Sequence, residues 1–187
     1  YLMAIAGLGS YGIVLGGWSS NNKYSLLGAL RAAAQMISYE LPMGIALLAV
    51  VLIVGSLNLR EIVEFQGGWP LIALQPVGFL LFLIAIIAES NRSPFDLPET
   101  ENELVSGFLT EYGGIKFALY FIAEYTAMVV NGAIVATIFL GGWKWPAAIS
   151  DLHPLAGVAL FLAKVAFVLF LFVWIRASTP RVRYDKF

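Results

Sequence analysis

The sequence predicts an all-α membrane protein, a polytopic bundle of transmembrane helices, from three observations. Of the 187 residues, 60% are hydrophobic and only 12% are charged, whereas a soluble domain has about 45–50% apolar and about 25% charged residues. The apolar residues gather in long runs, and a helix needs about 20 such residues to cross a bilayer. These runs lack the alternation of transmembrane β-strands, and backbone hydrogen bonding in lipid then favours helices.

Five apolar stretches meet this length rule. They cover residues 1–18, 41–59, 69–88, 117–143 and 154–175. We therefore treat residues 1–187 as a single transmembrane domain with five spans. The chain starts at Tyr1 without a basic region before its first apolar run, which is unlike a signal peptide. We expect its natural start to lie upstream.

Residues 23–40, between the first two stretches, form an amphipathic segment. Apolar residues recur there at helical spacing, at Leu26, Leu27, Leu30, Ala34 and Ile37. This pattern fits a helix on the membrane surface, an extension of the second span, or a plain connecting helix. In the first stretch, Gly7-Leu8-Gly9 predicts close helix packing, because small residues let membrane helices approach each other.

The basic residues predict the orientation of the bundle. If five spans alternate, Arg60 and Lys144 fall on one side, Lys164 lies within a span, and the other eight fall on the opposite side. Those eight are Lys23, Arg31, Arg92, Lys116, Arg176, Arg181, Arg183 and Lys186. Because cytoplasmic loops carry the excess of Lys and Arg, we expect loops 19–40 and 89–116 and the C-terminal tail to face the cytoplasm, or the matrix of a mitochondrion.

Composition and motifs argue against several functions. A net charge of -1 does not suit a nucleic-acid partner, which requires a surplus of Lys and Arg. The chain has no cysteine and so no cysteine-ligated iron–sulfur cluster, and its single His153 lacks zinc-ligand spacing. No hydrolase triad, phosphate-binding loop or dinucleotide motif is visible. We therefore expect no catalytic centre, metal or cofactor in this chain.

Half of the 12 acidic residues lie in the loop after the third stretch, at Glu89, Asp96, Glu99, Glu101, Glu103 and Glu111. Over residues 89–103, five acids and Arg92 give a charge of about -4. A solvated loop is the ordinary interpretation. However, interleaved hydrophobic residues predict that the loop folds inward, namely Phe95, Leu97, Leu104, Val105, Phe108 and Leu109. Like charges crowded beside lipid cannot all stay ionised, and such carboxylates are suited to storing and passing protons.

Three ionisable residues lie in or at the ends of the apolar stretches: Glu40, Glu124 and Lys164. A charge at the bilayer centre costs about 2.5–3.5 kcal/mol on insertion scales, so its default interpretation is functional. Glu124 shares a helical face with Tyr120, Met128 and Asn131. Lys164 is either a functional group or the counter-charge of a carboxylate.

Several segments, in order along the chain, carry a family resemblance. The main one is Ala88-Glu89-Ser90-Asn91-Arg92-Ser93-Pro94-Phe95-Asp96-Leu97-Pro98-Glu99, followed by Glu101, Glu103-Leu104-Val105 and Glu111-Tyr112. Supporting segments are Gly17-Trp18-Ser19-Ser20-Asn21-Asn22-Lys23-Tyr24, Leu30-Arg31-Ala32-Ala33-Ala34-Gln35, Ser38-Tyr39-Glu40, Ala123-Glu124-Tyr125 and Pro180-Arg181-Val182-Arg183-Tyr184-Asp185. Together they resemble the family of the H subunit of proton-pumping NADH:quinone oxidoreductase, respiratory complex I, whose mitochondrial member is NADH dehydrogenase subunit one. Thr100 stands where many relatives have glycine, which affects loop flexibility but removes no acid.

The resemblance implies a membrane subunit of eight spanning helices, of which this chain holds the third to the seventh. It implies that the loop at 89–112 walls a quinone cavity and that buried carboxylates couple quinone reduction to proton translocation. The implied proton relay consists of Glu40, Glu89, Glu99 and Glu124. The implied cavity residues are Arg92, Asp96, Glu101 and Glu103, and further candidates are Arg31, Glu111 and Lys164.

The resemblance also implies partners and a location. The chain would be a non-redox subunit of the respiratory chain, with quinone as substrate and with FMN and iron–sulfur clusters in partner subunits. A cluster-bearing subunit would lie beside the cavity, next to other peripheral-arm and membrane subunits and lipid. The bacterial inner membrane is the expected location, with the mitochondrial inner membrane as the alternative.

Two other functions remain open from the sequence. One is the homologous membrane subunit of an energy-converting hydrogenase, which a nickel–iron partner in place of co-purified quinone would reveal. The other is a cation-coupled secondary transporter, although paired broken helices, which mark many transporters, are not visible in the sequence.

Overall fold

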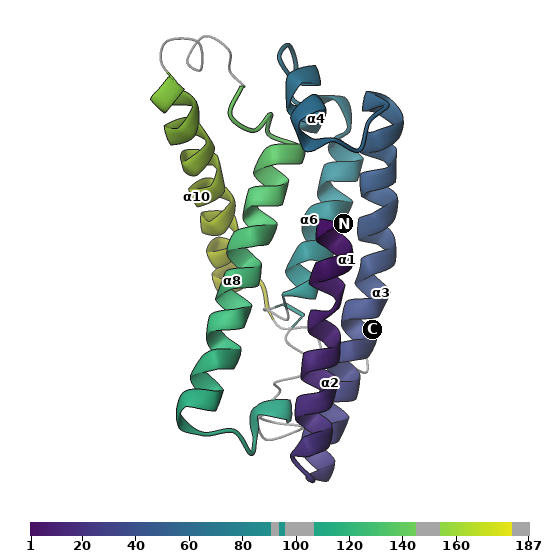
Figure 1. Cartoon of the computed structure of the whole chain (residues 1–187), viewed down its shortest axis with the longest axis vertical. Coiled ribbons are helices and arrows are strands. Elements are labelled where there is room, and N and C mark those ends of the chain that lie inside the picture. The colour runs from purple at the N-terminus through teal and green to yellow at the C-terminus, as the bar shows by residue number, and fades with distance from the viewer. Residues whose placement is uncertain (91–93, 96–106, 145–153, 181–187) are drawn as a thin grey trace. The chain divides into compact units, whose positions relative to one another are not determined.

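The computed structural model describes residues 1–90, 94–95, 107–144 and 154–180, and the chain within these ranges is helical (Figure 1). The elements are α1 (Leu2–Gly7), α2 (Gly9–Ser19), α3 (Lys23–Val54), α4 (Leu59–Phe65), α5 (Leu71–Leu74), α6 (Pro76–Glu89), the 3-10 helix η1 (Gly107–Leu109), α8 (Gly114–Ile138) and α10 (Pro154–Ser178). Strands are absent from the described ranges. The predicted all-α fold class is therefore confirmed.

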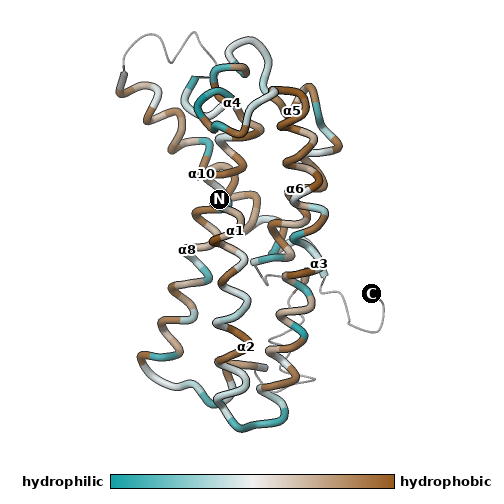
Figure 2. Tube along the Cα trace, turned by 45° about the vertical axis from the view of Figure 1, so that its right-hand side comes forward, coloured by the Kyte–Doolittle hydropathy of each residue, from teal (hydrophilic) through white to brown (hydrophobic). Residues whose placement is uncertain are grey.

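Three described helices are long and apolar enough to cross a membrane: Lys23–Val54, Gly114–Ile138 and Leu155–Ser178. They correspond to the second, fourth and fifth predicted spans. The first predicted span forms α1 and α2, between which Leu8 keeps right-handed helical angles (φ -64°, ψ -19°). The third is divided into α5 and α6 at Gln75. Both of these stretches contain apolar helices of fewer than 18 residues. In Figure 2, α6 and α10 are mainly hydrophobic, whereas α4 is largely hydrophilic.

The amphipathic segment 23–40 is the first part of α3, which continues past Pro42 into the apolar stretch. Of the predicted alternatives, the extension of the second span is the one observed. The helix ends at Val54, before the predicted end at residue 59. The helix ends there because Gly55, the next residue, has a left-handed φ of 80°. The Asn58 side chain then accepts a hydrogen bond from the amide of Arg60 at 3.1 Å and caps the start of α4.

The chain comprises two compact units. Unit 1 consists of Tyr1–Leu41, Ala85–Ala127 and Ile175–Phe187, and unit 2 of Pro42–Ile84 and Met128–Trp174. The single transmembrane domain predicted from the sequence stays a prediction.

Part of the core of unit 1 forms where α3 contacts η1. Ala29 from α3 and Phe108 and Leu109 from η1 are buried together. The Ser25 hydroxyl of α3 donates a hydrogen bond to the carbonyl of Phe108 at 3.2 Å. Two residues of the acidic loop thus fold inward as predicted, and Phe95 is half-buried. Leu97, Leu104 and Val105 lie outside the described residues.

The core of unit 2 includes an aromatic contact at the end of α8. The ring centroid of Phe139 lies 5.5 Å from that of Phe79 and 5.3 Å from that of Phe82. Gln66 is fully buried close by. Its side-chain oxygen accepts a hydrogen bond from the amide of Leu71 at 3.0 Å, which links the end of α4 to the start of α5.

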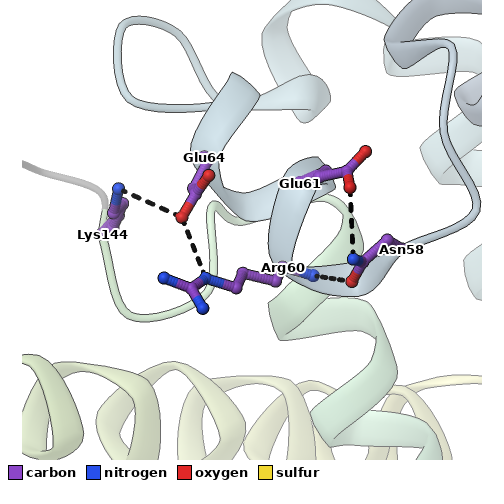
Figure 3. A network of polar contacts seen from close by, with 5 residues as sticks. All are labelled: Asn58, Arg60, Glu61, Glu64 and Lys144. Carbon is purple, nitrogen blue, oxygen red and sulfur yellow. Dashed lines mark hydrogen bonds and ion pairs between the residues drawn. The ribbon is translucent and has the colours of Figure 1, made fainter.

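A polar network on unit 2 joins α4 to the turn after α8 (Figure 3). The side chain of Arg60 contacts Glu64 at 3.1 Å, and that of Lys144 contacts the same carboxylate oxygen at 4.0 Å. These are the two basic residues that the sequence predicts on the side opposite to the other eight. Within unit 2 they share one carboxylate, and their place relative to a membrane stays a prediction.

Candidate functional site

Gln35 on α3 fixes the start of the acidic loop within unit 1. Gln35 is 7% exposed, and its side-chain nitrogen donates hydrogen bonds to the carbonyls of Ala88 at 2.7 Å and Phe95 at 2.9 Å. One helical turn further along α3, the ring centroid of Tyr39 lies 5.6 Å from that of Phe95. Because a buried amide must find hydrogen-bond partners, Gln35 holds the end of α6 and the described turn of the loop against α3.

Glu89 is the last residue of α6 and is only 8% exposed. The neighbouring Ser90 is 5% exposed, and its hydroxyl donates a hydrogen bond to the carbonyl of Ile87 at 2.9 Å. The C-terminal end of a helix carries a partial negative charge, and burial disfavours a second one. Glu89 is therefore a buried carboxyl at the negative end of a helix dipole.

Glu40 lies near the centre of α3, half-buried against α1. A Cβ atom placed on Gly7, the last residue of α1, would lie 2.6 Å from the Oε1 atom of Glu40. A larger residue at position 7 would therefore require the Glu40 side chain to shift. The packing role predicted for Gly7-Leu8-Gly9 holds for Gly7, whereas a Cβ atom on Gly9 would meet open space.

Glu124 lies on α8, on the face that the sequence predicts. Tyr120, Glu124 and Met128 are half-buried and Asn131 is 4% exposed. The residues on either side of Glu124 in the sequence are exposed. The burial pattern thus agrees with one inward face on this helix.

A tyrosine pair in unit 1 contacts the end of α2. The hydroxyl of Tyr112 donates a hydrogen bond to the carbonyl of Gly16 at 2.9 Å and lies 2.9 Å from the hydroxyl of Ser19. The ring of Tyr120 packs on that of Tyr112, with centroids 5.2 Å apart. The hydrogen bond with Ser19 lowers the pKa of Tyr112, because it stabilises the phenolate.

The remaining candidates differ in their surroundings. Arg31 is half-buried on α3. Glu111 is exposed and accepts a hydrogen bond from the side-chain amide of Asn22 at 2.7 Å. Lys164 belongs to unit 2, where its ammonium donates hydrogen bonds to the carbonyls of Leu140 and Gly142, both at 2.7 Å.

Five of the residues predicted for the proton relay and the quinone cavity lie outside the part of the chain that the structure describes. They are Arg92, Asp96, Glu99, Glu101 and Glu103. The described candidates Arg31, Glu40, Glu89, Glu111 and Glu124 all belong to unit 1. Among the residues that the structure describes, no group of three His, Cys, Asp or Glu side chains could hold a metal ion.

Sequence reasoning missed Gln35 and Tyr112 as members of this region. Gln35 lies on a different face of segment 23–40 from the apolar residues that predict the helix. Those apolar residues are exposed in the structure, whereas Gln35 is buried and needs internal hydrogen-bond partners. The partners lie 53 and 60 residues away, however, and helical periodicity does not reveal them. Tyr112 has no comparable signal in its local sequence.

Comparison with known proteins identifies the family. Residues 1–187 match the family described as NADH dehydrogenase. The H subunit of the NADH-quinone oxidoreductase of Rhodospirillum rubrum is 51% identical over 188 residues, which cover 100% of this chain and 56% of that protein. An H subunit from Geobacter sulfurreducens is 54% identical over 188 residues (100% and 52% covered), and that of Deinococcus deserti is 49% identical over 190 residues (99% and 48%). The chain spans about half the length of the curated relatives it matches. It belongs to the NADH dehydrogenase family that includes the H subunit of NADH-quinone oxidoreductase.

Proposed function

We propose that this chain is part of the H subunit, a membrane component of a proton-pumping NADH:quinone oxidoreductase, respiratory complex I. In this proposal the loop at 89–112 walls the quinone cavity, and carboxylates couple quinone reduction to proton translocation. The observation that carries the proposal is the buried carboxyl of Glu89 at the C-terminal end of α6. The relatives compared above are all named as subunits of NADH-quinone oxidoreductase, which favours a quinone enzyme over a hydrogenase.

The cavity chemistry is assigned to the loop acids. When a quinone is reduced to a quinol, electrons arrive first and the quinone oxygens then take up protons. Asp96, Glu101 and Glu103, with Arg92, respond to this change in charge. Their crowding makes their protonation states interdependent, so a change at one carboxyl shifts the others.

Glu89 is suited to pass this change onward. Its carboxyl is buried at the end of α6, where the acidic loop begins, and we infer that it exchanges a proton when the charge of the loop changes. Gln35 connects the loop turn at Phe95 with the end of α6, and both groups are thereby held against α3, the helix that carries Glu40. Glu99 and Glu124 complete the proposed relay.

The proposal includes a topology and an assembly. Five spans alternate across a bacterial inner membrane, with loops 19–40 and 89–116 and the C-terminal tail on the cytoplasmic side. Three long apolar helices and the uneven distribution of Lys and Arg support this arrangement. Partner subunits supply FMN and iron–sulfur clusters, and one cluster-bearing subunit lies beside the cavity.

Replacement of Glu89 by glutamine in the full-length subunit, within the assembled complex, tests the proposal. The amide keeps the shape of the side chain but cannot exchange a proton, so quinone reduction by NADH should fall about tenfold or more. Reduction of ferricyanide, which takes electrons before the quinone site, should be unchanged.

Glu61→Gln is the matched control, because Glu61 is an exposed acid on α4 of unit 2. It should leave both activities unchanged. Full quinone reduction and full proton pumping in an assembled Glu89→Gln complex would contradict the proposed role of Glu89. Equal loss of both activities would point to failed assembly.

A further inference from the structure

The carbonyl groups at the C-terminal end of α8 present a hydrogen-bonding problem within unit 2. The last four carbonyls of a helix have no partner in the helix itself. Ile138 and Phe139 are 4% and 0% exposed, so water does not supply partners there. The structure satisfies every carbonyl from residue 135 to residue 142, with donors from three sources.

Backbone amides satisfy some of these carbonyls. The amide of Phe139 donates to Val135, the amide of Gly142 to Ala136 and the amide of Lys144 to Gly141, at 2.9, 2.9 and 3.1 Å. Gly141 has φ 74° and Gly142 has φ 50°. This left-handed conformation favours glycine and turns the chain back on the helix end.

Groups from α4 and α5 satisfy the next carbonyls. The side-chain amide of Gln66 donates to the carbonyls of Thr137 at 3.3 Å and Ile138 at 2.9 Å. The backbone amide of Ile72 donates to the carbonyl of Phe139 at 3.0 Å. Only the carbonyls of Leu140 and Gly142 then remain.

The ammonium of Lys164 on α10 takes both of these carbonyls, each at 2.7 Å. A primary ammonium group has three N–H donors and can donate to both carbonyls at once. Its positive charge also matches the partial negative charge of a helix C-terminus. The charge of the ammonium, its number of N–H donors and its two distances to the carbonyls therefore all suit this position.

We propose that the turn at residues 140–142 is a carbonyl site for a primary ammonium group, and that Lys164 fills it as a tethered ligand. Lys164 then acts as a positioning residue that fixes the end of α8 against α10. This inference is independent of the proposed enzyme function, because it rests on the contacts of unit 2 alone. It gives the charged residue within the last predicted span a role that requires no change in protonation.

Chemical rescue tests this site in the full-length subunit within the assembled complex. Lys164→Ala removes the ammonium and leaves space that propylammonium, which matches the missing part of the side chain, can fill. Hydrogen–deuterium exchange of the amides of Gly142 and Lys144 should become about tenfold to hundredfold faster in this variant, because two charge-assisted hydrogen bonds are lost. Propylammonium should restore slow exchange, whereas tetramethylammonium, which has no N–H donor, should not.

Two further variants provide controls. Lys164→Met should show the same fast exchange but no response to propylammonium, because its own side chain fills the space. Lys144→Ala removes a nearby exposed lysine and should leave exchange at Gly142 unchanged. Exchange is the chosen readout because permeant amines collapse proton gradients and would obscure a pumping assay.

Two outcomes would overturn the proposal: slow exchange in Lys164→Ala without any amine, and equal effects of propylammonium and tetramethylammonium. If the Lys164→Ala complex does not accumulate, its yield is compared in cells grown with either amine. A higher yield with propylammonium supports the site, and equal yields refute it.

Discussion

Two helix ends carry ionisable side chains of opposite charge, and the comparison separates two roles. At the end of α8 in unit 2, the ammonium of Lys164 meets carbonyl groups, and its charge matches the helix terminus. At the end of α6 in unit 1, the buried carboxyl of Glu89 has the charge that the terminus disfavours. The first arrangement is stable as it stands. The second is the arrangement that we propose for a group that exchanges protons.

The comparison also shows that burial of a charge does not by itself identify a functional residue. The sequence alone leaves Lys164 as a functional group or as the counter-charge of a carboxylate. Its two hydrogen bonds to carbonyls give a third explanation. A default functional interpretation of intramembrane charges therefore needs to be checked against the backbone groups within reach.

Reversal of the charge at the α8 terminus should have the largest effect. Lys164→Glu places a carboxylate against carbonyl oxygens that it cannot bind, and we expect a destabilisation of about 3–5 kcal/mol or more. The assembled complex should then fail to accumulate, as measured by native gel electrophoresis of solubilised membranes. Normal accumulation would show that the α8 terminus does not depend on a positive charge.

Removal of the Gln66 side-chain amide, which binds the end of α8 and the start of α5, should have a smaller effect on stability. Gln66→Leu leaves buried carbonyls and the amide of Leu71 without their partner, which should cost about 1–3 kcal/mol. Thermal dissociation of the complex should occur at a lower temperature, and the amide of Leu71 should exchange faster. Gln75→Leu is the matched control, because the buried side-chain oxygen of Gln75 accepts no hydrogen bond from the described residues, and it should be nearly neutral.

Removal of the charge of Glu124 in unit 1 should lower activity and leave assembly intact. Glu124→Gln keeps the shape of the half-buried side chain, so assembly should survive. Quinone reduction and proton pumping should both fall about tenfold, equivalent to about 1.4 kcal/mol in the barrier, because the electron and proton steps are coupled.

A static ion pair is the alternative explanation for Glu124. In that case Glu124→Gln should lower stability and keep specific activity. Normal pumping per electron at normal turnover in the assembled variant would refute the relay role of Glu124.

The sequence predicts the long helices well, because composition and length alone identify a membrane helix. At Leu8, where α1 meets α2, no proline is present and the backbone keeps right-handed helical angles. The break at Gln75 has a signal in the sequence, because the residue before a proline avoids the helical region and Pro76 follows directly. Gln75 has φ -136° and ψ 63°.

The contacts that build the candidate site and the α8 terminus are harder to predict. Helical periodicity identifies which face of α8 carries Glu124, because burial repeats with the helix turn. It does not identify which carbonyls a buried side chain reaches. Gln35 pairs with Phe95 across 60 residues and Gln66 with Ile138 across 72, and such pairs are set by tertiary packing.

The smallest effect is expected at Glu111, an acid of the same loop in a different environment. Glu111 is exposed and accepts a hydrogen bond from Asn22, and the amide oxygen in Glu111→Gln can accept it equally well. Exposed polar contacts contribute about 1 kcal/mol or less, so assembly and quinone reduction should both stay close to those of the unchanged enzyme. Glu89→Gln, measured in parallel, differs chiefly in burial. If Glu111→Gln reduced quinone turnover as strongly as Glu89→Gln, burial at a helix end would not be the property that distinguishes the coupling carboxylate. The total negative charge of the loop would then be the better explanation.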